Sequence, residues 1–261
     1  MIESTFIHIP RVGATTEQKL WKNGVSNWHD FLSVNKIKGF SSAKKIESDS
    51  VLKQSKVALA NGDSAFFCSM PSTAHWRLWP QFRDEAIFVD IETDWHHDIT
   101  VLGIYDGKEV KQFIKGKNLT REAVAKHLQG KLVVTYNGAS FDLPIIKRFF
   151  GQSIMPTMPH FDTMHLARRL GYRGGLKALE RSLDIRRPDA IEGMSGEDAL
   201  HLWSLYKASG EKDYLDRLLA YNEEDIVNLP LIAKKLVFEG SAALNHANNH
   251  SRIETFSDSK V

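Results

Sequence analysis

The segment IFVDIET at residues 87–93 constrains the fold most, because it places two carboxylates within a run that otherwise has the composition of a buried strand. Its isoleucine, valine and phenylalanine residues favour a β-strand inside a sheet. Side chains two positions apart share one face of a strand, so Asp90 and Glu92 are expected to point the same way. Charged groups are costly to bury unless something neutralises them. The segment therefore predicts either a magnesium or manganese site, which suits such oxygen ligands, or a strand end with two solvated acids.

A second motif, VVTYNGASFDLPII at residues 133–146, joins a strand-like run to a helix-like run. The apolar run ends at Asn137 and Gly138. Pro144 is best tolerated in the first turn of a helix, so Asp142 is expected near a helix start. At that position the carboxylate would either belong to an acidic site or be the N-cap of the helix.

A third motif, AYNEEDIVNL at residues 220–229, reads as a late amphipathic helix. Tyr221 and Asp225 are four positions apart and so share one face of that helix. An ordinary surface helix with solvated acids is the alternative interpretation. The apolar stripe that would pack the helix onto a core consists of Ala220, Ile226, Leu229 and Leu231.

In this order the three motifs resemble the DEDD (DnaQ-like) exonuclease superfamily in its tyrosine subclass, over residues 85–238. The segments GLKALERSLDI and GMSGEDALHLWSLY are similar to the bacterial YprB-like branch of that superfamily. The resemblance implies an α/β fold, with a ribonuclease H-like mixed sheet flanked by helices. It also implies removal of nucleotides from the 3′ ends of DNA or RNA with two divalent cations, Mg²⁺ or Mn²⁺.

The resemblance also implies roles for individual residues. Asp90, Glu92 and Asp225 would hold the metal ions. Asp142 would complete the ligand set directly or through water, and Tyr221 would orient the attacking water.

Two further residues near these motifs have open roles. Asn137 would hold either the substrate or the loop that carries Asp142. Asp162, in HFDTMHLARR, would lie either at the metal site or at the N-cap of the helix that follows it.

The net charge of +2, from 34 basic and 32 acidic residues, does not by itself indicate nucleic-acid binding. Between His160 and Arg187, however, basic residues outnumber acidic ones. Such a stretch predicts phosphate contacts, foremost by Arg173 and Lys177 beside two glycines, although a solvated helix face has the same composition. The basic residues are Arg168, Arg169, Arg173, Lys177, Arg181, Arg186 and Arg187.

The remaining pattern predicts three antiparallel strands, a helix and a parallel strand, followed by mostly helical structure beyond residue 160. The first of these strands contains IFVDIET, and Asp106-Gly107 predicts a hairpin turn between the second and third. The second, third and fourth strands are expected at 99–105, 110–114 and 132–135, and the helix at 122–128.

Residues 1–35 predict a separate helical module in front of the catalytic domain. The segment IHIPRVG precedes two short helices and resembles the turn of a helix-hairpin-helix motif, which offers backbone N–H groups to a phosphate. Arg11 stands where that motif has glycine, which weakens the backbone site, and would contact phosphate itself. Ser26 is the expected cap of the second helix. A small helical cap packed on the catalytic domain is the alternative.

The other boundaries follow from composition. Residues 36–84 are expected to connect the module to a catalytic domain at 85–240, with their aromatic residues packed between the two. The polar segment 241–261 lacks periodicity and is expected to be a disordered tail. The aromatic residues concerned are Phe66, Phe67, Trp76 and Trp79.

The composition, 42% apolar and 25% charged, is typical of a soluble globular protein. The single cysteine, Cys68, excludes an internal disulfide and favours a reducing compartment. No signal peptide and no run of about 18–20 apolar residues is visible, so we expect a cytoplasmic protein without a membrane segment.

The sequence thus predicts a metal-dependent 3′–5′ exonuclease that acts on nucleic acid. One alternative is a structure-selective endonuclease on the same fold. The other is a catalytically silent nucleic-acid-binding protein, against which the intact set of acids argues, because binding alone does not require them.

Overall fold

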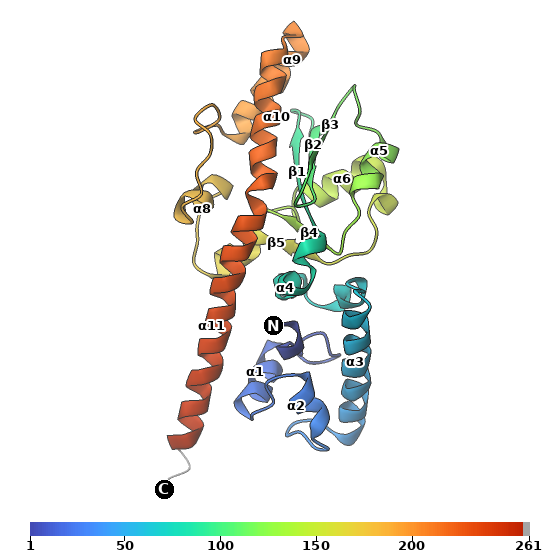
Figure 1. Ribbon diagram of the computed structural model, residues 1–261, viewed down its shortest axis with the longest axis vertical. Helices are drawn as coiled ribbons and strands as arrows, with labels where there is room; N and C mark the ends of the chain where they lie inside the picture. The colour runs from blue at the N-terminus through green and yellow to red at the C-terminus, as the bar shows by residue number, and fades with distance from the viewer. Residues whose placement is uncertain (258–261) are drawn as a thin grey trace.

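The computed structural model describes the backbone of residues 1–257 and the side chains of residues 1–244. Its centre is a five-stranded mixed sheet in the order β3-β2-β1-β4-β5 (Figure 1). β1 pairs antiparallel with β2 and parallel with β4, which confirms the predicted α/β fold and its strand order. The strands are β1 (Ala86–Thr93), β2 (Ile99–Tyr105), β3 (Val110–Ile114), β4 (Leu132–Thr135) and β5 (His160–Asp162).

The short edge strand β5 was not predicted. It has three residues, two of them polar, and it runs directly into helix α7, so its sequence carries mainly the signal of a helix start. Its place is fixed by pairing with β4, in which Thr135 lies opposite Asp162.

Helices cover both faces of the sheet. Ile87, Val89 and Ile91 point from β1 into an apolar cluster beneath α5 and α6, whereas Phe88 belongs to the cluster on the opposite face. Asp90 and Glu92 share the face of Phe88, as the alternation along a strand requires. The helices concerned are α5 (Arg121–His127) and α6 (Asp142–Phe150) on one face, and α9 (Gly196–Ser209), α10 (Lys212–Val227) and α11 (Leu229–Ser257) on the other.

The first 85 residues are mainly helical and share one apolar cluster with the sheet and α11. Trp76 and Trp79 are buried where this part meets the strands, and the Trp79 ring packs edge-on against Phe88 and Phe161. The predicted packing between the two parts is therefore confirmed for Trp76 and Trp79, whereas Phe67 packs against His8 and Trp28 within the N-terminal part. The elements are η1 (Ile2–Ser4), α1 (Ala14–Lys22), α2 (Trp28–Ser33), α3 (Ser42–Ala60), η2 (Ala65–Ser69), η3 (Ser72–Leu78), α4 (Trp79–Phe82) and η4 (Arg83–Glu85).

A buried ion pair also joins the N-terminal helices to the segment before β1. Arg77 Nη1 donates to both carboxylate oxygens of Glu17 at 2.9 and 2.8 Å, and Glu17 also accepts the backbone N–H of Phe6 at 2.7 Å. Both charged side chains are almost completely buried. Residues 1–35 are thus packed as a cap on the rest of the chain rather than held apart from it.

The predicted helix-hairpin-helix turn has a left-handed residue where that motif has glycine. Arg11 has a φ of 61°, and its exposed side chain precedes α1. The carbonyl oxygen of Arg11 accepts a hydrogen bond from Lys44 Nζ at 3.3 Å. The cap of α2 is Asn27 rather than Ser26, since the Asn27 side chain accepts from Asp30 N at 3.0 Å.

Helix α11 runs from the level of the sheet past the N-terminal helices (Figure 1) and contacts α7 (Thr163–Arg169) and α1. It continues through Ser257, so the backbone of residues 241–257 is helical where the sequence predicted a disordered tail; residues 258–261 lie outside the described residues. Among the described helices, none combines the length and the apolar character needed to cross a membrane.

Candidate metal centre

Three carboxylates converge on the face of the sheet that α10 covers. One oxygen from each of Asp90, Glu92 and Asp225 lies within 4.8 Å of the others. The first two come from β1, and the third lies on α10, one turn after Tyr221. The structure therefore brings together side chains that are more than 130 positions apart in the sequence.

The close approach of α10 to the sheet depends on Gly103, which lies opposite Asp90 on β2. A Cβ atom at Gly103 would lie 2.3 Å from Asn222 Oδ1, so a larger residue would displace the Asn222 side chain. Asn222 donates to Asp90 Oδ2 at 3.0 Å, and Gln112 donates to Asn222 Oδ1 at 3.1 Å. Asn222 thus fixes the Asp90 carboxylate from the helix side.

Asp142 is the first residue of α6, whose N-cap is Phe141, so the N-cap interpretation of Asp142 was wrong. Its Oδ1 accepts the backbone N–H of Ile91 at 3.0 Å, between the two acids of β1. The side chain is buried but does not belong to the group of three converging carboxylates. Asp142 is therefore anchored to the strand that carries the other acids.

Burial raises the pKa of each of these acids. Desolvation raises the pKa of Asp90 well above its usual value, and repulsion from Asp142, Asp225 and Glu92 raises it further. Desolvation raises the pKa of Asp142 to about 7. For Asp225, desolvation also raises the pKa, and the nearby charges of Arg187 and Lys177 partly offset this effect. Without a bound cation, the cluster therefore retains protons that isolated carboxylates would lose.

The donor set fits a hard divalent cation. It consists of carboxylate oxygens, its side chains are half-buried or buried, and its members repel one another when ionised. A cation that binds carboxylate oxygens would relieve both the desolvation and the repulsion.

These pKa shifts predict how stability depends on pH. The pKa of Asp142 rises from 3.8 to about 7 on folding. Protonated Asp142 therefore stabilises the folded state at low pH, and this contribution is lost as the pH rises through about 7. Asp142→Asn keeps an acceptor for Ile91 and does not titrate. The melting temperature of the metal-free variant should therefore rise relative to that of the metal-free wild type as the pH increases from 4 to 7.

The comparison between variants removes the contribution of the histidines that titrate in this range. The pKa values of His8 and His160 are lowered by burial to about 4, and they change stability in the opposite direction. They are present in both proteins and cancel in the difference. Calorimetric scans across this pH range check the result, and a constant difference in melting temperature would contradict it.

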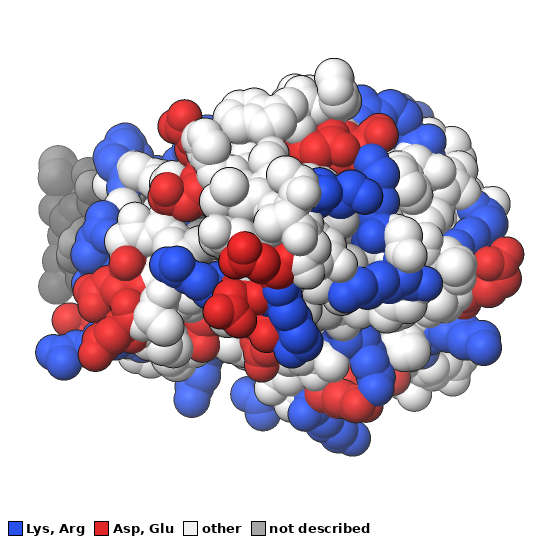
Figure 2. Space-filling view, turned by 90° about the horizontal axis from the view of Figure 1, so that it is seen from above, with Lys and Arg blue, Asp and Glu red and all other residues white. Residues whose placement is uncertain are grey.

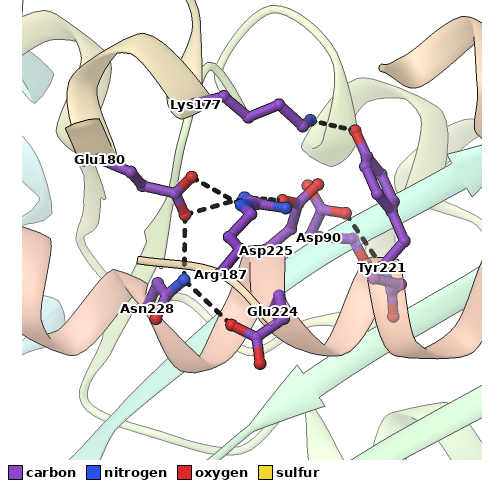
Figure 3. A network of polar contacts seen from close by, with 9 residues as sticks. Asp90, Lys177, Glu180, Arg187, Tyr221, Glu224, Asp225 and Asn228 are labelled. Carbon is purple, nitrogen blue, oxygen red and sulfur yellow. Dashed lines mark hydrogen bonds and ion pairs between the residues drawn. The ribbon is translucent and has the colours of Figure 1, made fainter. Parts of the chain in front are cut away.

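Tyr221 lies beside the acids and is held by a lysine. Its hydroxyl accepts a hydrogen bond from Lys177 Nζ, which also lies 4.2 Å from the centre of the Tyr221 ring (Figure 3). Burial, and then the charges of Asp225 and Glu92, raise the pKa of Tyr221. The phenol is therefore protonated, and Lys177 points into the site rather than outward.

The sequence analysis named Arg187 only as one member of the basic stretch, and it assigned no role to Glu180. Arg187 contacts Asp225 through Nη2 and forms two hydrogen bonds to Glu180, at 2.7 and 2.8 Å (Figure 3). Asn228 donates to Glu180 at 3.1 Å. Burial would lower the pKa of Arg187, but the contacts with Glu180 and Asp225 outweigh it and raise the pKa. A fixed cation therefore stands at the edge of the acid cluster.

Asp162 organises the loop that precedes Asp142. Its carboxylate accepts the backbone N–H groups of Asn137 at 2.8 Å, Ala139 at 3.0 Å and Met164 at 3.1 Å. The last contact is the cap of α7, which confirms that predicted alternative. Asn137, with a φ of 63°, is thus held through its backbone at the turn after β4.

The acids open into a cavity of about 500 Å³. Trp95, which the sequence analysis did not select, lines this cavity together with Phe141 and Leu200. The Trp95 ring is 55% exposed, and its Nε1 donates to Ser204 Oγ at 3.2 Å. The cavity is therefore lined by acidic side chains and by an accessible aromatic side chain.

None of the three predicted phosphate contacts lines this cavity, although Lys177 reaches its edge through Tyr221 and lines a second cavity with Glu180 and Arg187. Arg173 donates through Nη1 to the carbonyl oxygens of Arg168 and Tyr172, each at 3.1 Å, and Arg11 lies in the turn before α1. On the surface seen from the top of the molecule as oriented in Figure 1, basic and acidic side chains are interspersed (Figure 2). That face therefore has no continuous basic surface.

Comparison with known proteins agrees with this fold and site. Residues 87–237 match the RNase_H superfamily, and the chain belongs to it. Members of this superfamily are usually nucleases that act on nucleic acid and generally use divalent metal ions. The matched region contains all the acids described above.

A relative from Bacillus subtilis (strain 168), the uncharacterized protein YprB, is 32% identical over 138 residues. The similarity covers 48% of this chain and 33% of the relative, so the chain spans about a third of that protein's length. The predicted ribonuclease H-like superfamily is thus confirmed, while the DEDD exonuclease assignment and its tyrosine subclass remain predictions.

Proposed function

We propose that this protein is a metal-dependent 3′–5′ exonuclease that hydrolyses phosphodiester bonds of nucleic acid. The observation that carries the proposal is the convergence of Asp90, Glu92 and Asp225 within 4.8 Å, beside Tyr221 and in an open cavity. These acids, with Asp142, would hold two divalent cations, Mg²⁺ or Mn²⁺. When bound, such ions stabilise the attacking and leaving oxygens of an in-line displacement at phosphorus.

The side chains around the acids would position the reactants. Tyr221 would orient the attacking water with its protonated hydroxyl, which Lys177 holds in place. Lys177 would also contact a substrate phosphate, since its ammonium group lies inside the site. Asn137 would act through the loop that leads to Asp142. Arg173 and Arg11 would contact phosphates further along the nucleic acid.

The exposed ring of Trp95 supports nucleic acid as the substrate, because nucleobases stack on aromatic side chains. Such stacking contributes about 1–3 kcal/mol per base, so Trp95→Ala should weaken the binding of a single-stranded oligonucleotide by roughly 5- to 150-fold. Fluorescence anisotropy with Ca²⁺ in place of the catalytic metal measures this affinity.

Trp95→Phe is the matched control, since it keeps an aromatic face and should keep most of the affinity. Equal binding by the alanine variant and the wild type would show that Trp95 does not contact the bases.

The direction of cleavage separates the proposed function from its alternatives. Oligonucleotides of DNA and RNA, single-stranded and duplex, are labelled at the 5′ end and incubated with Mn²⁺. An exonuclease shortens them stepwise from the 3′ end and fails on a substrate whose 3′ terminus is an inverted linkage. Internal cuts that survive this block would favour a structure-selective endonuclease. Binding without cleavage would favour a catalytically silent protein.

A further inference from the structure

Arg187 lies at the acid cluster in a geometry that the proposed function does not explain. It follows α8 (Leu176–Ser182), and its side chain is only 6% exposed. The guanidinium bridges two buried carboxylates, Glu180 and Asp225, which are 2% and 8% exposed. Glu180 has no place in the proposed ligand set. A buried arginine is thus shared between a structural acid and a proposed metal ligand.

The two carboxylates hold Arg187 unequally. Glu180 binds it through both Nε and Nη2, and Asn228 holds Glu180 in turn. Asp225 receives a contact from Nη2 alone. The remaining nitrogen, Nη1, is buried and has no hydrogen-bond partner among the described residues. The pairing with Glu180 therefore anchors the guanidinium, while its hydrogen-bonding capacity is only partly used.

A divalent cation on Asp225 would compete with this arginine. Both need the same carboxylate oxygens, and two positive charges a few ångströms apart repel each other strongly in a partly desolvated site. If Asp225 turns to the metal, Arg187 remains on Glu180, and the Nη2 donor that contacted Asp225 is released beside the cluster. A planar guanidinium with free donors is well suited to bind a phosphate.

We propose that Arg187 exchanges partners during the reaction, pairing with Asp225 in the metal-free protein and with the substrate phosphate once metal is bound. Arg187 thereby couples metal binding to phosphate binding. It weakens the binding of metal alone and strengthens the binding of metal and phosphate together, and this coupling is reciprocal. The inference rests on the proposed function, because it requires that Asp225 is a metal ligand.

The test measures two affinities by isothermal titration calorimetry. The first is that of Mn²⁺ for the protein alone, and the second is that of adenosine 5′-monophosphate in saturating Mn²⁺. Arg187→Gln should bind Mn²⁺ alone about tenfold more tightly than the wild type, because a repelling charge is gone. The same variant should bind the nucleotide at least tenfold more weakly. A residue that merely orients Asp225 would give the opposite result for metal, since its loss would disorder the ligand.

Two further variants make the result interpretable. Arg83→Gln makes the same change at an exposed arginine outside the basic stretch and should leave both affinities unchanged. Because Arg187→Gln leaves Glu180 buried without its partner, Glu180→Gln,Arg187→Gln replaces the pair by two amides and should show the same two shifts. Unchanged or weaker Mn²⁺ binding in both Arg187 variants, or unchanged nucleotide binding, would overturn the exchange.

The partner exchange and the proposed function can be disproved separately. If the wild type cleaves nucleic acid and binds Mn²⁺ but the Arg187 variants behave like it, only the partner exchange is wrong. If Mn²⁺ does not bind the wild type, the proposed function fails and the exchange fails with it.

Discussion

Asp90→Asn should reduce the rate of phosphodiester cleavage by roughly 10²–10⁴-fold while the protein stays folded. Losing a ligand of a catalytic metal forfeits several kcal/mol of transition-state stabilisation, and each 1.36 kcal/mol is a factor of about ten in rate. Asp225→Asn should have an effect of similar size. Both carboxylates belong to the converging group, and among the described residues Asp225 is the only acid of α10 in that group. Single-turnover cleavage with saturating enzyme measures the loss.

The matched control is Glu223→Gln, which removes an exposed acid from the same helix as Asp225. It should cleave at the wild-type rate. The metal-free Asp90→Asn variant should melt no lower than the wild type, because the replaced carboxyl is buried among other acids that raise its pKa. Near-normal cleavage by the double variant Asp90→Asn,Asp225→Asn would show that these acids take no part in the mechanism.

The largest effect on stability is expected at the buried ion pair of the N-terminal cap. Arg77→Met leaves Glu17 buried without its cationic partner, and breaking a buried pair in this way costs about 3–5 kcal/mol of unfolding free energy. Urea unfolding at neutral pH measures the change. The affinity for Mn²⁺ should stay the same, because neither residue lines the acid cavity.

Two controls separate the buried pair from charge in general. Arg83→Met removes the cation of the exposed pair with Asp84, whose side chains are 57% and 90% exposed, and should cost at most about 1 kcal/mol. Glu17→Gln,Arg77→Met removes both charges and should recover part of the lost stability. A loss below about 1 kcal/mol for Arg77→Met would mean that the cap is not stabilised through this pair.

Strands β1 to β4 and the proposed metal ligands could be predicted because their signals are local. Asp90 and Glu92 are neighbours within one strand, and alternation alone places them on one face. Strands β2, β3 and β4 begin and end at the predicted residues because turn residues and apolar runs adjoin in the sequence. The α/β fold followed from these elements and their order.

The groups that complete the centre could not be predicted, because each acts through a partner remote in sequence. Arg187 looked like any member of a basic stretch, and its partner Asp225 is 38 positions away. Asn222 reaches Asp90 across 132 positions. One signal was available: a glycine within a strand often marks the close approach of another element, and Gly103 marks where Asn222 packs.

The packing of the N-terminal helices against the rest of the chain could not be predicted from the sequence either. Their apolar residues indicate that a face is buried but not against what. Trp76 and Arg77 belong to a segment that looked like a connector, yet they carry the apolar and ionic contacts between the two parts. The predicted domain boundaries at residues 35 and 84 therefore fall within one continuous hydrophobic core.

Anomalous diffraction at the manganese edge tests the central claim most directly. Crystals of the wild type would be soaked with Mn²⁺ and adenosine 5′-monophosphate. We predict anomalous peaks in contact with the carboxylates of Asp90, Glu92 and Asp225, and loss of those peaks in crystals of Asp90→Asn,Asp225→Asn. Clear density for these side chains without manganese beside them, in protein that cleaves nucleic acid in solution, would contradict the assignment of this cluster as the metal centre.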